Sequence, residues 1–389
     1  MTATKLYVRD HCIIGPMKYR RLLNVGSLVL LAGCAAVTDS TRDPGVRRLG
    51  AAEGRALVTR LLPDSVKERS GWAADIYAAF ASLDLSPSPE NICAAIAIMG
   101  QESGFQVDPV VPGLGAIARK EIERRRESAG VPRVALDAAL SIASTNGKTY
   151  GERIDAARTE AQLSEIYEDF IGRVPLGKTF LADRNPVRTA GPMQVSIAYA
   201  ETFTKTRPYP YPVTAGIRHE LFTRRGGLYF GIAHLLSYPA PYPRMLYRFA
   251  DFNSGQYASR NAAFQSAITQ VSGIPLELDG DLLRYDHGSP TRASGSTELA
   301  VRVVARRWNL SDFAVREDLE SEKSVEFERT RLYTRVFALA DEVATTPAPR
   351  AVLPKIPLHS PKITRELTTE WFASRVEVRY QACLKRLSD

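Results

Sequence analysis

One acidic residue, Glu102, stands out because an apolar helical segment leads directly to it. The apolar stripe of this segment consists of Ile92, Ala95, Ile96 and Met99. A carboxylate at the C-terminal end of a helix meets the unfavourable end of the helix dipole, which favours a functional role over that of a solvated surface acid. A carboxyl group withdrawn from water has a raised pKa and can donate a proton near neutral pH. Glu102 is therefore our candidate general acid, and a solvated helix-end acid is the alternative.

The helix that carries Glu102 has sequence signals at both ends. Ser88 supplies a capping hydroxyl, Pro89 suits the first helical position, and Glu90 places an acid in the first turn. Gly104 ends the helix just after Glu102. These signals predict a helix that begins at residue 89 and delivers Glu102 in its last turn.

The rest of the chain is patterned mainly as helices. Segment 115–182 is rich in charge and helical in pattern, and its dense run at 121–127 is interpreted as a solvated helix face. The Pro-Tyr segments 207–212 and 238–243 bracket a further helix, and they serve either as aromatic platforms for sugar rings or as rigid connectors. There is no heptad run, internal repeat or alternating strand series, so the predicted fold class is mainly α.

The N-terminal region has the pattern of a lipoprotein signal peptide. A basic segment, 17–21, precedes an apolar run, 22–30, and Leu31-Ala32-Gly33-Cys34 matches a lipobox. The run is much shorter than the roughly 20 residues of a membrane-spanning helix. We therefore expect residues 1–33 to be an upstream extension plus signal peptide, with Met17 as the natural start, and residues 34–48 to be a tether lipidated at Cys34. Ala35-Ala36 resembles the outer-membrane sorting pattern of bacterial lipoproteins and implies a location on its periplasmic face.

Processing changes the charge and the cysteine count. Loss of five basic residues and one acidic residue lowers the formal net charge from +8 to +4. A charge of this size does not indicate a nucleic-acid-binding protein, but it suits binding to an anionic polymer such as the cell wall. Cys93 and Cys383 remain in an oxidising compartment as a candidate disulfide, with a simple core role for Cys93 equally expected. The five histidines show no ligand spacing, so no metal site is predicted.

The C-terminal region divides into two predicted parts. Five prolines space out a stiff linker over 346–361, and an amphipathic helix within 362–389 carries Cys383. We expect this C-terminal helical extension to pack back on the body.

Five short segments, taken in chain order, resemble the lytic transglycosylases of the goose-lysozyme-like superfamily. The family patterns are Glu-Ser-x-Phe, Gly-Leu-Met-Gln, Asn-x-x-x-Gly-x-x-Tyr-Leu, Tyr-Asn-Ala-Gly and a Glu-Thr-x-x-Tyr-Val-like segment. The corresponding segments here are Glu102-Ser103-Gly104-Phe105, Gly191-Pro192-Met193-Gln194, the stretch 227–235, Phe252-Asn253-Ser254-Gly255, and the stretch 328–333 that ends in Tyr333. The resemblance implies a lysozyme-like helical domain over 49–345.

The chain departs from this pattern in several places. About 85 residues separate the first two segments, several times the usual gap, which implies a helical subdomain inserted at 115–182. Pro192 replaces a leucine and Gly227 stands where the pattern has asparagine. Tyr333 also lies unusually far downstream of Asn253.

The resemblance implies a mechanism with a single carboxylate and no cofactor. Glu102 would protonate the glycosidic oxygen and then, as a carboxylate, take the proton of the muramyl C6 hydroxyl, which closes on C1 as a 1,6-anhydro sugar. Ser103 would bond that carboxylate. The implied substrate-binding residues are Ser103, Met193, Gln194, Asn253 and Tyr333, with local turn bonding as the alternative for Gln194 and Asn253. Asp251 and Asp108 are candidates for activating water in a hydrolytic variant, although caps or surface charges are favoured.

The sequence therefore predicts a lipid-anchored periplasmic murein lytic transglycosylase. Its partners would be peptidoglycan glycan strands and, through Cys34, the membrane, with no nucleic acid. The alternative from another class is a non-catalytic lipoprotein that binds peptidoglycan or serves as an envelope scaffold.

Overall fold

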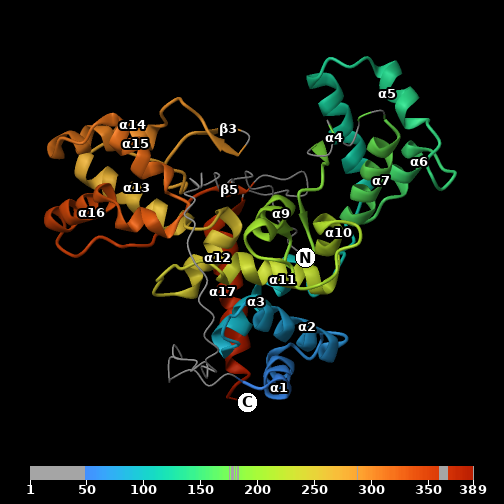
Figure 1. The fold of residues 1–389 in the computed structure, drawn as a ribbon, viewed down its shortest axis with the longest axis horizontal. Coiled ribbons are helices and arrows are strands. Elements are labelled where there is room, and N and C mark those ends of the chain that lie inside the picture. Colours follow the sequence, from blue (N-terminus) through green and yellow to red (C-terminus); the bar gives the residue numbers. More distant parts are fainter. Residues whose placement is uncertain are drawn as a thin grey trace, which may run out of the picture.

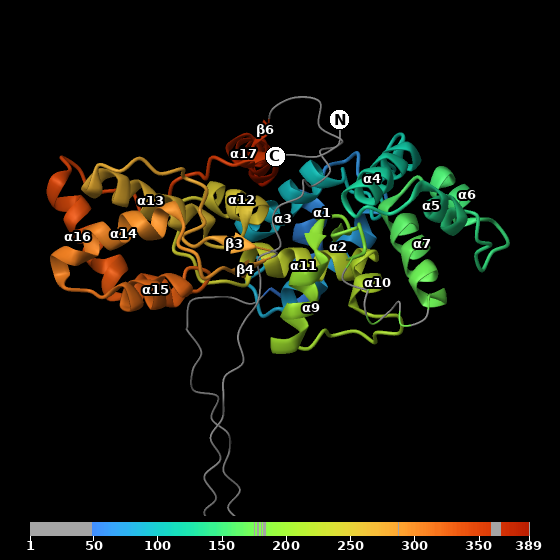
Figure 2. The ribbon, with the colours of Figure 1, turned by 90° about the horizontal axis from the view of Figure 1, so that it is seen from above.

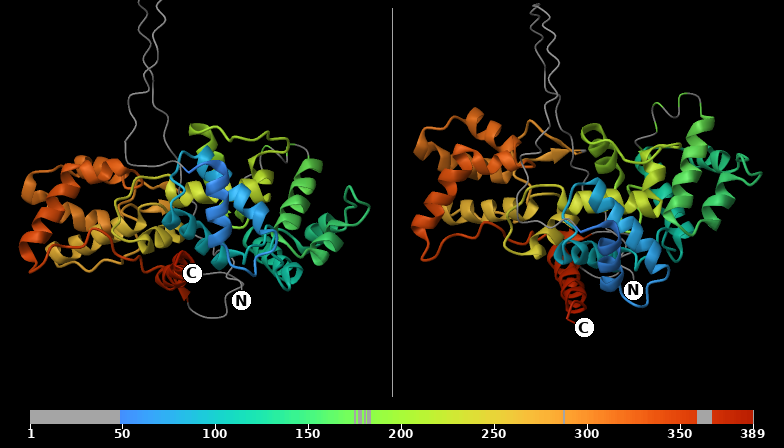
Figure 3. Two further views of the ribbon diagram at one scale, coloured as in Figure 1. Left: turned by 90° about the horizontal axis from the view of Figure 1, so that it is seen from below. Right: turned by 60° about the horizontal axis from the view of Figure 1, so that its bottom comes forward.

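The structure is a computed structural model that describes residues 49–174, 176, 179, 181, 184–286, 288–358 and 367–388. The described chain is mainly helical, as expected, and its strands are three two-residue pairs. Figure 1 shows a central body with one helical lobe on either side of it. The views in Figures 2 and 3 agree that the two lobes lie at opposite ends of the molecule.

The central body contains the largest hydrophobic core, formed by segments from both ends of the chain. Its helices are α1 (Ala51–Leu61), α2 (Arg69–Ser82), α3 (Pro89–Glu102), α9 (Ile197–Thr206), α10 (Ile217–Leu221), α11 (Arg224–Leu236), α12 (Met245–Ser254) and α17 (Thr369–Lys385). Helix α3 lies inside this core, because each residue from 92 to 99 is buried. The predicted apolar stripe was thus too narrow, since the whole helix is surrounded.

The segment predicted as an insertion is helical in the structure. Its helices are α4 (Leu114–Ser128), α5 (Arg133–Leu140), α6 (Tyr150–Ala156) and α7 (Glu160–Arg173). The charged run of α4 forms ion pairs within its own helix, with Glu121 bonded to Arg124 and Arg125 at 2.7 Å. This agrees with its interpretation as a solvated face.

The second lobe has a separate core, which corrects the expectation of one catalytic domain over 49–345. Its elements are α13 (Ala258–Ser272), β3 (Tyr285–Asp286), β4 (Ser289–Pro290), α14 (Ser296–Ala305), η2 (Arg306–Trp308), α15 (Asp312–Glu320), η3 (Val325–Arg329) and α16 (Arg331–Val343). A cluster of apolar side chains from α13 to α16 is buried within the lobe and is distinct from the central core. Segment 49–345 therefore spans two cores in addition to the inserted subdomain.

The described part of the expected Pro-rich linker is bound along the second lobe before it reaches α17 of the body. The amide of Val352 donates to the carbonyl of Ser259 at 3.0 Å, and that of Lys355 donates to Leu278 at 2.8 Å. Strand β5 (Pro357–Leu358) pairs with β6 (Leu367–Thr368), directly before α17. This segment is thus part of the packed structure, contrary to the expectation of a stiff spacer.

The C-terminal helix packs back on the body, as expected. Helix α17 lies against both α3 and α12. Cys93 of α3 and Cys383 of α17 form a disulfide with their Cα atoms 5.5 Å apart, which confirms the candidate pair. The two ends of the body are thereby joined at the helix that carries Glu102.

Within the described residues, none of the helices has the length and apolar character needed to cross a membrane. The predicted signal peptide and the lipidation residue Cys34 lie outside the described residues.

Candidate functional site

Helix α3 holds Glu102 at its buried C-terminal end. The hydroxyl of Ser88 accepts the amide of Asn91 at 3.3 Å, so the predicted N-cap is confirmed. The helix ends at Glu102, whose side chain has no exposed surface. Glu102 is therefore packed inside the body at the point where α3 ends.

The chain after Glu102 turns through two consecutive left-handed residues. Gly104 has a φ of 59° and Phe105 a φ of 63°, and such a conformation is strained for a phenylalanine. The turn brings the Phe105 ring edge-on to Trp72, with ring centroids 5.9 Å apart. Gly104 thus ends α3 as expected, and Phe105 joins the core beside the helix end.

Ser103 does not make the bond that the resemblance implied. It is fully buried, and its hydroxyl donates to the carbonyl of Met99 at 3.3 Å, one helical turn back. A hydroxyl has a single proton to donate, so it does not donate to Glu102 here. The neighbour on the other side, Gln101, is also buried, and its side-chain oxygen has no hydrogen-bond partner among the described residues.

The Gly-Pro-Met-Gln segment forms the turn of a small hairpin. Strands β1 (Thr189–Ala190) and β2 (Val195–Ser196) pair on either side of it, and Ser196 then caps α9. The left-handed Gly191, with a φ of 76°, lies in this turn, and α9 begins only after the hairpin.

Gln194 uses its side chain within this hairpin. Its side-chain nitrogen donates a hydrogen bond to the carbonyl of Gly191 at 3.2 Å. Its side-chain oxygen accepts a hydrogen bond from the Thr189 hydroxyl at 3.1 Å. The residue is 2% exposed and has a φ of 50°, which is unfavourable for glutamine. The structure thus shows the local turn bonding that was the alternative for Gln194.

Met193 and Asn253 belong to the same central core as the end of α3. Met193 is fully buried against Gly231 of α11, where an added Cβ would lie 2.5 Å from the methionine sulfur. Asn253 is 1% exposed, and its oxygen accepts the hydroxyl of Thr369, the first residue of α17, at 3.1 Å. The side-chain nitrogen of Asn253 has no partner among the described residues. Helix α17 therefore links the helix of Asn253 to the helix of Glu102.

Tyr333 lies outside this arrangement, which corrects its assignment to the site. It is buried in the second lobe, where its ring contacts Phe337 at a centroid distance of 4.6 Å and Phe264 at 6.1 Å. The hydrophobic pattern of α16 accounts for this position without a role in binding.

The two alternative acids have different surroundings. Asp108 is half-buried in the loop after α3. Asp251 is fully buried, and its oxygens accept hydrogen bonds from the hydroxyls of Tyr238 and Tyr242 and from the amides of Tyr257 and Ser259. Burial raises the pKa of Asp251, while these hydrogen bonds oppose the rise. Asp251 is thus an anchor for the start of α13 and for the 238–243 segment.

The Pro-Tyr segments act as connectors. Tyr209 stacks on Phe230 with centroids 5.1 Å apart, and its hydroxyl donates to Glu220 at 2.9 Å. Tyr238 and Tyr242 are tied to Asp251. These three rings are held by the body, which favours the connector interpretation over sugar platforms.

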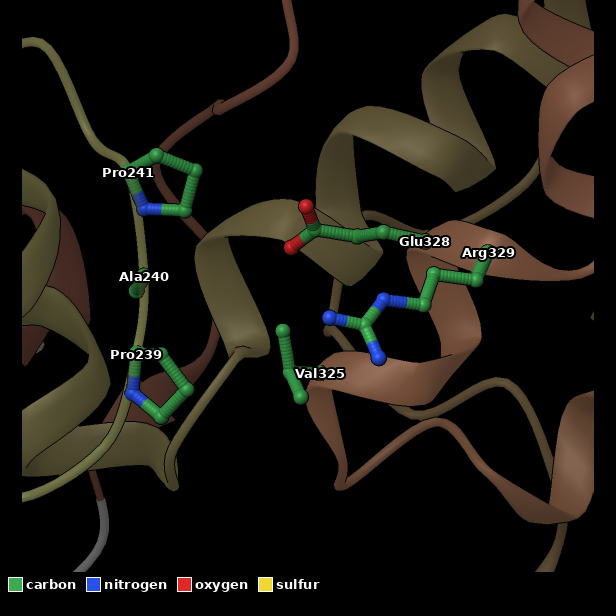
Figure 4. Close-up of a pocket in the computed structure, with 6 residues that line it drawn as sticks. All are labelled: Pro239, Ala240, Pro241, Val325, Glu328 and Arg329. Atoms are coloured by element: carbon green, nitrogen blue, oxygen red, sulfur yellow. The ribbon is translucent and has the colours of Figure 1, made fainter.

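Glu102 does not line either of the two cavities described next, whose lining residues all belong to the described part of the chain. One, of about 500 Å³, lies between the body and the second lobe, where Glu328 and Arg329 of η3 face the loop from Pro239 to Pro241 (Figure 4). Glu328 already contacts the buried Arg260 at 3.5 Å. The other, of about 370 Å³, lies among α4, α5, α6 and α7. Among the described residues, histidine, cysteine and acidic side chains form no cluster that would hold a metal ion.

Comparison with known proteins identifies relatives along nearly the whole chain. The family described as "Protein of unknown function (DUF1615)" matches residues 65–386. The chain is 48% identical over 364 residues to the "Uncharacterized protein YaiW" of Escherichia coli (strain K12), covering 94% of this chain and 98% of the relative. No solved structure matches the chain significantly. The chain belongs to the DUF1615 family.

Proposed function

We propose that this protein is a murein lytic transglycosylase, anchored through a lipidated Cys34 to the periplasmic face of the outer membrane. The observation that carries the proposal is the full burial of one acid, Glu102, at the end of a core helix. The sequence around it resembles the catalytic segment of lytic transglycosylases, and Met193, Gln194 and Asn253 follow in the order of that family's motifs. The substrate would be the glycan strand of peptidoglycan, and the fold would be lysozyme-like.

Glu102 would act twice on the bond between N-acetylmuramic acid and N-acetylglucosamine. Its carboxyl proton passes to the glycosidic oxygen as the bond from C1 to that oxygen breaks. The carboxylate then takes the proton of the C6 hydroxyl, whose oxygen bonds to C1 of the same sugar. The Asn253 amide nitrogen, which has no partner among the described residues, is suited to an N-acetyl or peptide carbonyl.

The burial of Glu102 also supports a second candidate function. A glycan strand reaches a side chain with no exposed surface only if the surrounding elements separate. A protein that keeps this helix end as a structural element would bind peptidoglycan, or serve as an envelope scaffold, without cleaving it. The tight packing of Pro192 against Gly227 favours this candidate, because it departs from the motif of active relatives.

The test is to incubate the purified protein with sacculi and to analyse released muropeptides by mass spectrometry. We expect 1,6-anhydro products from the unaltered protein and their loss in Glu102→Gln. Glu90→Gln is the matched control, because it makes the same change in an exposed residue of the same helix. Its products should equal those of the unaltered protein.

The remaining outcomes separate the candidates. Products with free reducing ends would mark a hydrolase and contradict the transglycosylase step. Release that continues in Glu102→Gln would remove Glu102 from the mechanism. Binding to sacculi without release, equal in the unaltered protein and Glu102→Gln, would identify the non-catalytic protein.

A further inference from the structure

The inserted subdomain is built around a cavity where a filled core would be expected. Four short helices enclose a space of about 370 Å³. Helix α5 has no buried residue, although Leu136, Ala139 and Leu140 line this space, and α4 buries only Leu114 and Gly115. The fully packed core of the subdomain is limited to Tyr150, Ile154, Ala157 and Ile166. Protein interiors are normally packed without voids of this size.

The wall of the cavity is almost entirely hydrocarbon. The apolar side chains that line it are Leu114, Ile117, Ala118, Ile122, Leu136, Ala139, Leu140, Tyr150, Ile154, Leu163, Ile166, Phe170, Pro186 and Val187. Apolar cavities stay dry and accept apolar ligands, as an engineered cavity of about 150 Å³ does with benzene. The space here is more than twice the volume of that cavity, which holds six carbons, so it accommodates roughly twelve to fifteen carbons. This matches one chain of about twelve carbons.

The polar part of the cavity lining includes one arginine, Arg125. Arg125 lines it, and its Nε donates to Glu121 at 2.7 Å, while its terminal NH2 groups donate to no described residue. Tyr167 also lines the cavity. Burial raises the pKa of Tyr167. The positive charges of four arginines oppose this rise, and these arginines are Arg184, Arg125, Arg188 and Arg218. The remaining charged groups in the wall are Glu121, which is bonded to two arginines, and Glu160.

We propose that the subdomain binds a single acyl chain of about twelve carbons in this cavity, with the anionic head group of the ligand at Arg125. The chain would complete the apolar core between α4, α5 and α7. A planar carboxylate or a phosphate suits the free edge of a guanidinium group. The lobe that would carry this site is set apart from the central body in Figure 1. The site is independent of Glu102 and of cleavage.

The test is calorimetric titration of the purified full-length protein with dodecanoic acid, below its micelle concentration. We expect saturable binding of one molecule per chain. Ala139→Trp fills the cavity and should weaken binding at least tenfold. Val134→Trp is the matched control, because it adds the same side chain to the same helix at a residue that is 79% exposed, and it should bind as the unaltered protein does. If Ala139→Trp loses helical circular dichroism, Leu136→Phe takes its place as a smaller filling change.

The head group is tested with a neutral chain and with a second pair of variants. Arg125→Ala should weaken the binding of dodecanoic acid about fivefold and leave the binding of dodecanol unchanged. Arg124→Ala removes the other partner of Glu121 and should change the affinity for neither ligand. Titration with a twelve-carbon lysophosphatidylglycerol tests a lipid phosphate as the head group. If it binds more tightly than dodecanoic acid, the site prefers a lipid phosphate, and if it binds more weakly, the site prefers a free carboxylate. Absence of saturable binding, or equal affinity in the unaltered protein and Ala139→Trp, would overturn the proposal. Equal weakening of acid and alcohol by Arg125→Ala would overturn the placement of the head group.

Discussion

Pro192 lies directly against Gly227. A Cβ added at Gly227 would come within 2.5 Å of the proline Cδ and 3.0 Å of the Gly191 Cα. Both residues depart from the lytic transglycosylase motifs, which have leucine and asparagine at these two positions. The contact shows that the two departures form one packing unit, because a larger side chain at 227 does not fit beside this turn.

Gly227→Ala should destabilise the protein by about 2–3 kcal/mol, since the added methyl group meets backbone and ring atoms that cannot rotate away. Thermal unfolding followed by circular dichroism measures the loss. Gly100→Ala is the matched helix control, because its Cβ meets only ordinary contacts, 3.5 Å from Arg379 and 3.6 Å from Phe105. The control should be neutral or slightly stabilising. Equal melting temperatures for the two variants would contradict the packing argument.

Reduction of the Cys93–Cys383 disulfide should lower the free energy of unfolding by about 3–5 kcal/mol, because the bond closes a long loop of chain in the unfolded state. Chemical denaturation with and without dithiothreitol measures the difference. The double variant Cys93→Ala, Cys383→Ala should resemble the reduced protein and show no response to the reagent. A response of that variant would show that dithiothreitol acts elsewhere.

Glu322 should make stability depend on pH. It is fully buried in the second lobe and accepts hydrogen bonds from the Leu282 amide and the Tyr285 hydroxyl. Burial raises the pKa of Glu322 from 4.5 to about 7, against the opposing effect of Lys323. The folded state therefore keeps a proton that the unfolded state releases, so stability falls as pH rises from about 4.5 to 7 and is level above that.

Glu322→Gln should remove this pH dependence, which amounts to about 3 kcal/mol at 1.36 kcal/mol per pKa unit. Denaturation curves between pH 5 and pH 8 provide the measurement. Glu326→Gln, at an exposed residue paired with Arg329, should keep the slope of the unaltered protein. An unchanged slope in Glu322→Gln would rule out Glu322 as its source.

Local signals predicted the helix of Glu102, and long-range contacts decided what surrounds it. Ser88 and Gly104 act within one turn of the chain, so their effects on α3 follow from residue type alone. The bond between Asn253 and Thr369 joins residues 116 positions apart, and no local pattern indicates it. The helical pattern of α16 was visible, but the sequence does not say which of two cores its apolar face joins, and Tyr333 was assigned to substrate binding although it lies in the second core.

The left-handed conformation of Gln194 links stability to function in the proposed enzyme. Glycine adopts a φ of 50° without strain, so Gln194→Gly gains backbone relief of about 1 kcal/mol and loses the bonds to Thr189 and Gly191. These effects oppose each other, and we expect a stability within about 1 kcal/mol of the unaltered protein. Release of anhydromuropeptides should nevertheless fall at least tenfold, because strain retained in a buried polar residue is typical of functional sites. Thr189→Val, which removes one of the two bonds and keeps the amide, should retain most of the release. Full release by Gln194→Gly would limit Gln194 to the structure of the turn.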